Sequence, residues 1–398
     1  MALNTLHKKL FPGQKWMTIV IVIIGILLLS MIGYSVYLYM QNTALKVAAS
    51  KNSATIAEVN KELNDIKSQD PYKNNIALQK QIDQVQTTFT QSVAVYENLL
   101  DLENPPKDIK GLDALYANVL NELSKSDYTG AASSLTDISL KITAEQSKVA
   151  AADAAAIPAT LPISTSAPAS GSYSRQQVVT DVGNFMVDIV AGDLGSTKVI
   201  VDTASDSTCG NNCPVLPLAT YVSRSGAYAG VNGSYFCPAS YPTCVGKTNS
   251  FDLLLMNKNK TYFNSDNNVY STNPGVVFGG SYIRFLTAVS GWGRDTSIDS
   301  MISNYPLLVS GSNIVFSGSS DPKINSASTR SFVANKGNTV YIGVVHGATT
   351  EQVAHVMKTL GMDNALNLDD GGSAAFWYGG YKVGPGRDLP NVILFVKK

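Results

Sequence analysis

The sequence has little charge and no net charge. Its 30 Lys and Arg balance 30 Asp and Glu, and only 15% of its 398 residues are charged. Proteins that bind nucleic acid usually present an excess of basic residues, because phosphate contacts supply most of the affinity. The charge balance therefore argues against a nucleic-acid partner and provides no basic field for anionic polymers in general.

Several catalytic motifs are missing as well. The chain has no G-x-x-x-x-G-K-[ST] phosphate loop, no G-x-S-x-G nucleophile motif, no H-E-x-x-H metal motif and no dinucleotide fingerprint. It has only three histidines and no cluster of metal-ligating residues, which argues against a zinc enzyme.

Cysteines are few and confined to one segment, as Cys209/Cys213 and Cys237/Cys244. In an oxidising compartment this arrangement favours two local disulfides. The alternative is a zinc site made of four thiolates, but the spacings are wider than the usual C-x-x-C pairs. A low charge with many Gly, Ser, Asn and Tyr residues is typical of an exported, β-rich protein.

Residues 16–40 form an uninterrupted apolar run that is long enough to cross a lipid bilayer. Trp16 lies at one end and Tyr37 and Tyr39 lie towards the other, where interfacial aromatic residues belong. Lysines in the stub of residues 1–15 predict that the N-terminus stays in the cytoplasm and the rest of the chain is exported. The run is too long for a cleaved signal peptide, so we predict an uncleaved, single-pass anchor in the cell membrane.

Residues 41–153 are rich in Ala, Lys, Gln and Leu and have almost no Gly. Apolar residues keep helical spacing as far as Pro71 and again as far as Pro105-Pro106, and further helices are expected at about 108–125 and 128–152. We predict a helical stalk or small bundle. A coiled coil that mediates self-association is the alternative. Residues 154–172, mostly Ala, Pro, Ser and Thr, indicate a linker.

From residue 173 to 398 the pattern changes to short apolar runs separated by Gly, Asn and Pro, which predicts an α+β domain with a mixed β-sheet. One helix is well specified over 350–360, since Thr349 and Gln352 form a capping box and Gly361 marks its end. A short buried strand, 365–368, is expected directly after this helix.

Polar residues follow several of the predicted strands. Asp369 and Asp370 precede Gly371, Gly372 and Ser373, so carboxylates meet a backbone that turns sharply and can approach a ligand. Arg330 precedes a strand and is a candidate phosphate anchor, because its planar guanidinium forms paired hydrogen bonds. His346 follows a strand and could act as an acid or base. The alternatives are an ordinary turn, a surface arginine and a structural histidine.

Six segments together resemble the phosphodiester glycosidase family, and they occur in the family's order. They are Gly-Val-Asn-Gly-Ser-Tyr-Phe (230–236), Tyr-Pro-Leu-Leu-Val (305–309), Thr-Arg-Ser-Phe-Val-Ala (329–334), Gly-Ala-Thr-Thr-Glu-Gln-Val-Ala (347–354), Leu-Gly-Met-Asp-Asn-Ala-Leu-Asn-Leu-Asp-Asp-Gly-Gly-Ser (360–373) and Gly-Arg-Asp-Leu-Pro-Asn (386–391). The resemblance covers about 180–398. It implies hydrolysis of a sugar-1-phosphodiester to free sugar and a phosphomonoester.

The resemblance also implies site residues. Those that match the family's motifs are Asn232, Arg330, Asp369, Gly371, Gly372, Ser373 and Arg387. Asp369 is expected to be nucleophile or base, and His346 a proton donor. Arg330 and Arg387 are expected to hold the phosphate, and Asn232 and Ser373 to donate hydrogen bonds to the substrate. Asp370 departs from the family, which usually reads Asp-Gly-Gly-Gly-Ser.

The expected substrate is a sugar-phosphate polymer or another glycan of the cell envelope. The pair Asp369 and Asp370 leaves open a divalent cation, Ca²⁺ or Mg²⁺, because both ions prefer oxygen ligands. The competing hypothesis is a non-catalytic surface module that binds phosphosugars or cell-envelope polymers, in which Asp370 marks lost activity.

Overall fold

The fold is described from a computed structural model that covers residues 13–68, 70–102, 110–155, 157–158, 160–319 and 321–398. By their internal contacts the residues form two compact units, 1–84 and 85–398. Two features expected from the sequence, the lysines at positions 8 and 9 and the helix end at Pro105-Pro106, lie outside the described residues.

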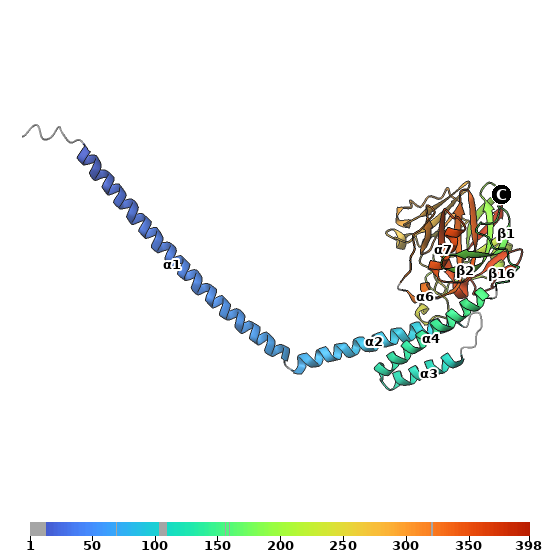
Figure 1. The fold of residues 1–398 in the computed structure, drawn as a ribbon, viewed down its shortest axis with the longest axis horizontal. Coiled ribbons are helices and arrows are strands. Elements are labelled where there is room, and N and C mark those ends of the chain that lie inside the picture. Colours follow the sequence, from blue (N-terminus) through green and yellow to red (C-terminus); the bar gives the residue numbers. More distant parts are fainter. Residues whose placement is uncertain (1–12, 69, 103–109, 156, 159, 320) are drawn as a thin grey trace, which may run out of the picture. The chain divides into compact units, whose positions relative to one another are not determined.

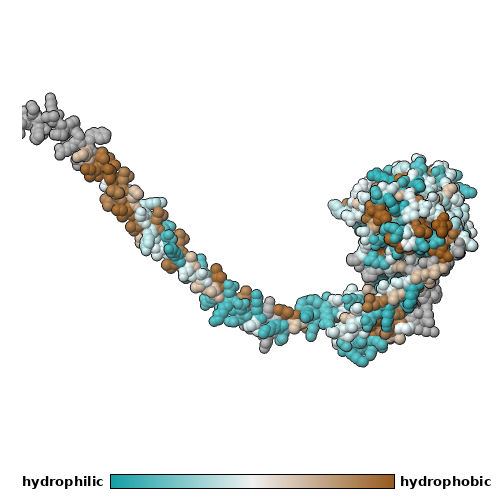
Figure 2. Space-filling view, in the orientation of Figure 1, coloured by the Kyte–Doolittle hydropathy of each residue, from teal (hydrophilic) through white to brown (hydrophobic). Residues whose placement is uncertain are grey.

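The first unit is dominated by one long helix, α1 (Gly13–Ser68). Its stretch from Ile19 onward is long and apolar enough to cross a membrane, and this stretch is exposed in the isolated chain. Figure 2 shows the apolar side chains concentrated along the N-terminal part of α1. α1 ends at Ser68, and the next helix, α2 (Asp70–Leu102), carries Pro71 in its first turn, where proline is tolerated. The chain therefore has one candidate membrane helix in its described part.

The second unit begins with helices that build a core of their own. The C-terminal part of α2, together with α3 (Lys110–Ser124) and α4 (Tyr128–Ala155), buries one apolar stripe from each helix. Val95, Val119 and Leu135 lie at its centre. α4 also packs against strands of the β-rich region, so these helices are attached to that region and do not stand apart from it (Figure 1).

Three antiparallel sheets form the β-rich region. The first has the order β1-β2-β13-β12-β14-β10-β11, the second β16-β15-β4-β17-β3 and the third β6-β5-β9-β7-β8. The strands of the first sheet are β1 (Tyr173–Thr180), β2 (Gly183–Asp193), β13 (Thr339–Ala348), β12 (Ser328–Lys336), β14 (Asn364–Asp370), β10 (Leu307–Ser310) and β11 (Asn313–Ile314). Those of the second are β16 (Tyr381–Val383), β15 (Phe376–Tyr378), β4 (Ala229–Asn232), β17 (Asn391–Lys397) and β3 (Thr197–Thr203). Those of the third are β6 (Tyr262–Phe263), β5 (Leu255–Met256), β9 (Ser300–Ser303), β7 (Gly275–Gly279) and β8 (Tyr282–Leu286).

The main core lies between the sheets, where Val333 and Ile342 of the first sheet meet Ile393 of the second and Ile302 of the third. α7 (Thr350–Thr359) covers the other face of the first sheet with Val353 and Met357. The remaining helices are α5 (Leu218–Ser225), α6 (Pro322–Asn325) and the short 3-10 helices η1 (Pro242–Cys244), η2 (Asp266–Asn268), η3 (Val289–Gly291) and η4 (Gly371–Ser373).

The expected α+β class is confirmed by this arrangement. The capping box of Thr349 and Gln352 is present at the start of α7, and Gly361 follows its end with φ of 72°. The cysteines pair as two local disulfides, Cys209–Cys213 and Cys237–Cys244.

The segment expected to be a linker, 154–172, differs from the expectation in its second half. Ile163 bridges to Gln177 of β1, and the amide of Gly171 donates to Ala191 of β2. Backbone hydrogen bonds, which composition does not reveal, hold this segment along the first sheet.

Candidate functional site

A cavity of about 510 Å³ opens where β12 begins and β13 and β14 end. Its lining brings together most of the residues that the sequence singled out: Arg330, His346, Asp369, Asp370, Gly371, Ser373 and Arg387. A volume of this size and a mixed polar and aromatic lining are typical of small-molecule sites. Two further expected residues, Asn232 and Gly372, are considered below.

Asn232 supports the floor of the cavity from behind. It is fully buried at the end of β4, and its side-chain Nδ2 donates to the carbonyl oxygen of Asp369 at 2.6 Å. Its Oδ1 accepts from the hydroxyl of Ser331 at 2.7 Å and from the amide of Ala375. Asn232 therefore fixes the acidic loop, and its amide is used within the protein. β4 pairs with β15 and β17, so the Asn-Gly sequence closes a paired strand and is not a hairpin turn.

Asp369 carries the clearest electrostatic signature in the cavity. Its carboxyl group is 8% exposed and accepts a hydrogen bond from the amide of Asp370 at 2.9 Å. Burial, and secondarily the neighbouring negative charge of Asp370, raises the pKa of Asp369 to about 8, although a hydrogen bond from Ser373 opposes the shift. At neutral pH Asp369 is therefore mostly protonated and can donate a proton.

Asp370 and Arg330 form an ion pair across the first sheet. The β12–β14 register places the two residues opposite each other, and Arg330 Nη1 donates to Asp370 Oδ2. Arg330 is 1% exposed, and its other nitrogens donate to backbone carbonyls, among them those of Lys323 at 2.7 Å and Ser326 at 2.5 Å. The guanidinium expected to hold phosphate is thus bound within the protein, and its nearest carboxylate partner is the residue that departs from the family.

The glycines after the aspartates shape the turn that closes the floor. Gly371 has φ of 58°, a conformation that favours glycine over residues with a side chain. Asp370 itself has φ of −143°, which is extended backbone that any residue adopts. The aspartate at this position therefore causes no backbone strain. Gly372 is buried in η4, where its carbonyl accepts from the amide of Arg387 at 2.9 Å.

Arg387 lies at the rim of the cavity, where it contacts α2. Its Nη2 is 3.0 Å from Asp101 Oδ1 of α2, and its guanidinium lies over the ring of Tyr241. Tyr241 also donates its hydroxyl to Asp101. Although burial by itself lowers it, the interactions with Tyr241 and with the Asp101 carboxylate raise the pKa of Arg387 overall, so this cation is available to a phosphate only beside a competing carboxylate.

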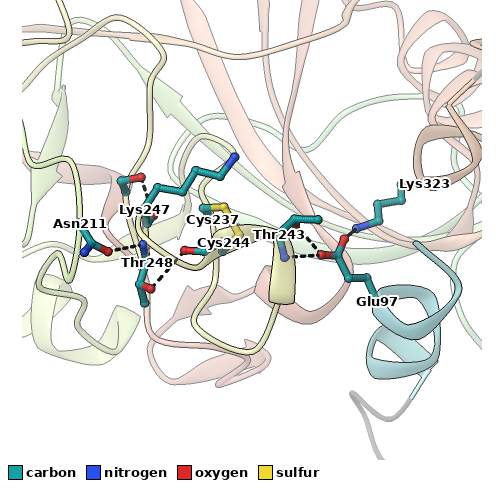
Figure 3. Close-up of a disulfide and its surroundings, with 9 residues drawn as sticks. Glu97, Asn211, Cys237, Thr243, Cys244, Lys247, Thr248 and Lys323 are labelled. Atoms are coloured by element: carbon teal, nitrogen blue, oxygen red, sulfur yellow. Dashed lines mark hydrogen bonds and ion pairs between the residues drawn. A yellow bond between two sulfur atoms is a disulfide. The ribbon is translucent and has the colours of Figure 1, made fainter. Parts of the chain in front are cut away.

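A second contact between α2 and the β-rich region lies beside the first. Glu97 Oε1 accepts from the amide and hydroxyl of Thr243, and its Oε2 is 3.0 Å from Lys323 Nζ. Figure 3 shows these contacts next to the Cys237–Cys244 disulfide. This disulfide closes the short loop that carries Tyr241 and Thr243. The loop therefore presents Tyr241 and Thr243 to α2.

Sequence reasoning missed two parts of the site. The helices contribute Asn98, Asp101, Leu102, Gln146 and Val149 to the lining, and the β-rich region contributes Tyr235, Tyr241 and Tyr305. The rings of Tyr235 and Tyr305 are 5.0 Å apart, and the hydroxyl of Tyr235 donates to Asp370 at 3.2 Å. Tyr235 and Tyr305 lie inside two of the segments that resemble the family, so the resemblance could have identified them as site residues. No pattern in the sequence marked the helical residues as part of the site.

His346 lines the cavity at the end of β13. Its Nε2 is 2.7 Å from Oδ2 of Asp188, a fully buried residue of β2 that the sequence did not single out. Arg175 bridges both oxygens of Asp188 at 2.9 Å, and Tyr173 donates its hydroxyl to Oδ1. Although burial alone raises it, these hydrogen bonds hold the pKa of Asp188 below its ordinary value, so this carboxylate is ionised.

The fit of a metal ion can be tested on the acidic pair. In the part of the chain that the structure describes, no three His, Cys, Asp or Glu side chains are grouped as metal ligands. The carboxylate of Asp370 accepts from Arg330 and Tyr235, so a cation at Asp369 and Asp370 would have to compete with a guanidinium. The residues present fit a cation poorly.

Comparisons with known proteins agree with the resemblance in the sequence. Residues 225–396 match the model of the phosphodiester glycosidase family. A comparison with curated proteins found no match to this sequence.

Two solved structures are similar to the chain at a distance. One is the catalytic domain of zebrafish N-acetylglucosamine-1-phosphodiester alpha-N-acetylglucosaminidase, auto-inhibited by its pro-peptide. It has 15% identity and a TM-score of 0.45 over 57% of this chain and 83% of that chain. The other is a hypothetical protein from Synechocystis, with 12% identity and a TM-score of 0.41 over 57% of this chain and 62% of that chain. The chain thus spans less than two thirds of the length of the cyanobacterial protein.

Within the sheet-rich region, residues 225–396 accordingly match a phosphodiester glycosidase domain. In this chain the domain follows one candidate membrane helix and a set of packed helices.

Proposed function

We propose that the protein hydrolyses a sugar-1-phosphodiester, releasing the free sugar and a phosphomonoester. The observation that carries the proposal is Asp369, a buried carboxyl group whose pKa is raised to about 8, in a cavity that it shares with Arg387. A proton donor beside a cation suits a reaction that expels a phosphate from an anomeric carbon.

In the proposed reaction Asp369 acts as a general acid. As the bond between the anomeric carbon and the phosphate oxygen breaks, Asp369 protonates that oxygen, and water adds to the carbon, which has oxocarbenium character in the transition state. This role replaces the nucleophile or base role expected from the sequence, because a group protonated at neutral pH donates its proton more readily than it attacks.

The other lining residues bind the two halves of the substrate. Arg387 offers a guanidinium to the phosphate, and the rings of Tyr235 and Tyr305 give an aromatic surface for the sugar. Arg330 acts indirectly in this proposal, since it holds Asp370 and the loop that carries Asp369. Ser373, which is 1% exposed, hydrogen-bonds Asp369 and tunes its acidity.

We further propose that the domain faces the outside of the cell membrane, held there by α1 with its N-terminus in the cytoplasm. Two disulfides support an oxidising compartment, and the candidate membrane helix supports the anchor. The substrate that suits this placement is a sugar-phosphate polymer or glycolipid of the cell envelope.

Self-association through residues 41–153 is a separate proposal. Light scattering of the detergent-solubilised chain tests it.

The test is an assay of the full chain in detergent against a panel of sugar-1-phosphodiesters, with and without a chelator. We expect release of free sugar that Asp369→Asn abolishes. Activity should persist in the chelator, because the acidic pair fits a cation poorly; loss of activity that Ca²⁺ or Mg²⁺ restores would contradict that conclusion. The absence of any sugar release across the panel would contradict the proposal.

A second candidate function, a non-catalytic module that binds phosphosugars, is favoured by one observation. Asp370 supplies the carboxylate that Arg330 binds, where the family usually has glycine. The discriminating variant is Asp370→Gly. A wild-type chain that binds the panel without turnover, together with turnover gained in Asp370→Gly, would establish the binding module instead of the enzyme.

A further inference from the structure

We propose that Asp188 is a positioning residue that makes His346 the general base of the proposed reaction. The inference rests on the proposed function and adds a second proton-transfer group to the cavity of Asp369. It starts from a buried carboxylate that the reaction described above leaves unused.

The hydrogen bonds of Asp188 determine which nitrogen of His346 carries a proton. Asp188 is ionised, because Arg175 and Tyr173 also donate to it, and an ionised carboxylate only accepts hydrogen bonds. The His346 Nε2 at 2.7 Å from Asp188 must therefore be the protonated nitrogen in the neutral ring. Nδ1 then carries the lone pair.

That lone pair is not used by the protein. Nδ1 makes no hydrogen bond to any of the residues that the structure describes, and the side chain of His346 is 14% exposed. The ring borders both the cavity of Asp369 and a second cavity of about 340 Å³. In the proposal Nδ1 serves the cavity of Asp369, because a neutral imidazole fixed in one tautomer there has the arrangement of a general base whose partner carboxylate orients it.

The proton transfers assigned to His346 and Asp369 balance over one turnover. Nδ1 of His346 takes a proton from water as the water oxygen bonds to the anomeric carbon. The bond from that carbon to the phosphate oxygen breaks, and the proton of Asp369 goes to the departing phosphomonoester. His346 then returns its proton to solvent and Asp369 takes one up, which restores the starting state. This assignment reverses the proton-donor role that the sequence suggested for His346.

The chain contains a matched control pair. His355 Nδ1 is 2.7 Å from Asp181 Oδ1 on the outer side of α7, and Asp181 has a side chain that is 71% exposed. This pair has the same chemistry but does not line the cavity. Asp181→Asn therefore measures what the loss of a histidine–aspartate hydrogen bond does away from the site.

The first readout needs no substrate. Nitrogen-15 spectra of the full chain, labelled at histidine, report the tautomer of each ring, and His355→Gln helps to assign the signals. We expect His346 to be protonated at Nε2 in the wild type, and Asp188→Asn to shift the ring towards protonation at Nδ1. Arg175→Gln leaves the Asp188–His346 contact in place and should keep the wild-type tautomer. Protonation of the wild-type ring at Nδ1 would overturn the proposal.

The second readout is turnover. We expect His346→Gln to lower kcat about 100-fold or more, which is the usual contribution of a general base. Asp188→Asn should approach that loss with KM changed less than about threefold, and the double variant should lose no more than His346→Gln alone. Asp181→Asn should leave kcat unchanged. Independent, multiplying losses in the double variant would show that Asp188 acts through the fold instead.

The two proposals fail in different ways. If the wild-type chain hydrolyses no member of the panel, the proposed function fails, whatever the tautomer of His346. If the wild type turns over and Asp369→Asn abolishes the activity, but His346→Gln keeps it, the proposed function stands and the role of His346 and Asp188 is overturned.

Discussion

The floor and the rim of the cavity hold similar charges in different ways. At the floor, Arg330 meets Asp370 between neighbouring strands, and Arg330 is almost completely buried. At the rim, Arg387 meets Asp101 across two segments that are far apart in the sequence, and the two side chains are 16% and 27% exposed. Asp370 is 17% exposed, so the contrast comes from the buried guanidinium of Arg330, which makes the floor pair costly to break, whereas solvent reaches both members of the rim pair.

This difference separates two tasks. The floor fixes the acidic loop and sets the acidity of Asp369, which requires a dry and rigid setting. At the rim, Asp101 of α2 holds Arg387, the cation that a phosphate would need. A phosphate can bind Arg387 only if this contact exchanges readily. Substitutions at the floor should therefore have large effects and those at the rim small ones.

The largest effect is expected for Asp369→Asn. The amide has nearly the same shape but cannot deliver a proton, so kcat should fall by about 10²–10⁴-fold. The measurement is sugar release by the full chain, with the exposed Asp266→Asn as the control. Activity within twofold of the wild type would remove Asp369 from the chemistry.

The next largest effect is expected for Asp370→Asn, measured as the free energy of unfolding of the second unit. Removing this carboxylate leaves the buried charge of Arg330 without its partner, which should cost about 3 kcal/mol. The comparison is with Asp101→Asn at the rim, which should cost less than about 1 kcal/mol. Equal losses in urea denaturation would erase the distinction between floor and rim.

A pH dependence follows from the raised pKa of Asp369. The unfolded chain loses this proton near the ordinary value of 3.8, and the folded chain keeps it to about 8. The stability that comes from the protonated group is therefore complete below about pH 4 and is lost as the pH rises towards 8. Asp369→Asn cannot ionise, so its Tm should exceed that of the wild type by a margin that grows from pH 4 to pH 8.

Circular dichroism at several pH values checks this expectation, because it records the Tm of both proteins without a substrate. A margin that stays constant across this range would show that the pKa of Asp369 is not raised in the folded protein.

The smallest effect is expected for Asp101→Asn on ligand affinity. Removing the carboxylate beside Arg387 lifts a repulsion on an incoming phosphate, and a unit charge at about 4 Å is worth about 1 kcal/mol in water. Inhibition by inorganic phosphate should therefore strengthen by up to about fivefold. Asp181→Asn, a carboxylate that does not line the cavity, is the control. Weaker inhibition would mean that Asp101 helps Arg387 to bind anions.

Much of the β-rich domain could be predicted from the sequence, because the signals there are local. The capping box of α7, the strand before Asp369 and the short spacings of the cysteines each depend on residues close together in the chain. The six segments also placed Asp369 and Arg387 in one site before any coordinates, and the end of a predicted strand singled out His346; the cavity contains all three.

Tertiary structure alone decided the partners of these residues. Arg330 looked like a phosphate anchor, but the register of β12 and β14 sets it against Asp370. Asp188 looked like one more residue of a strand, but the pairing of β2 with β13 brings it to His346. The sequence determined which side chains and elements are present, since these depend on neighbours along the chain. Only folding determined the charges that each side chain meets, since their partners stand on other strands and helices, 40 positions away for Arg330 and Asp370 and 158 for Asp188 and His346.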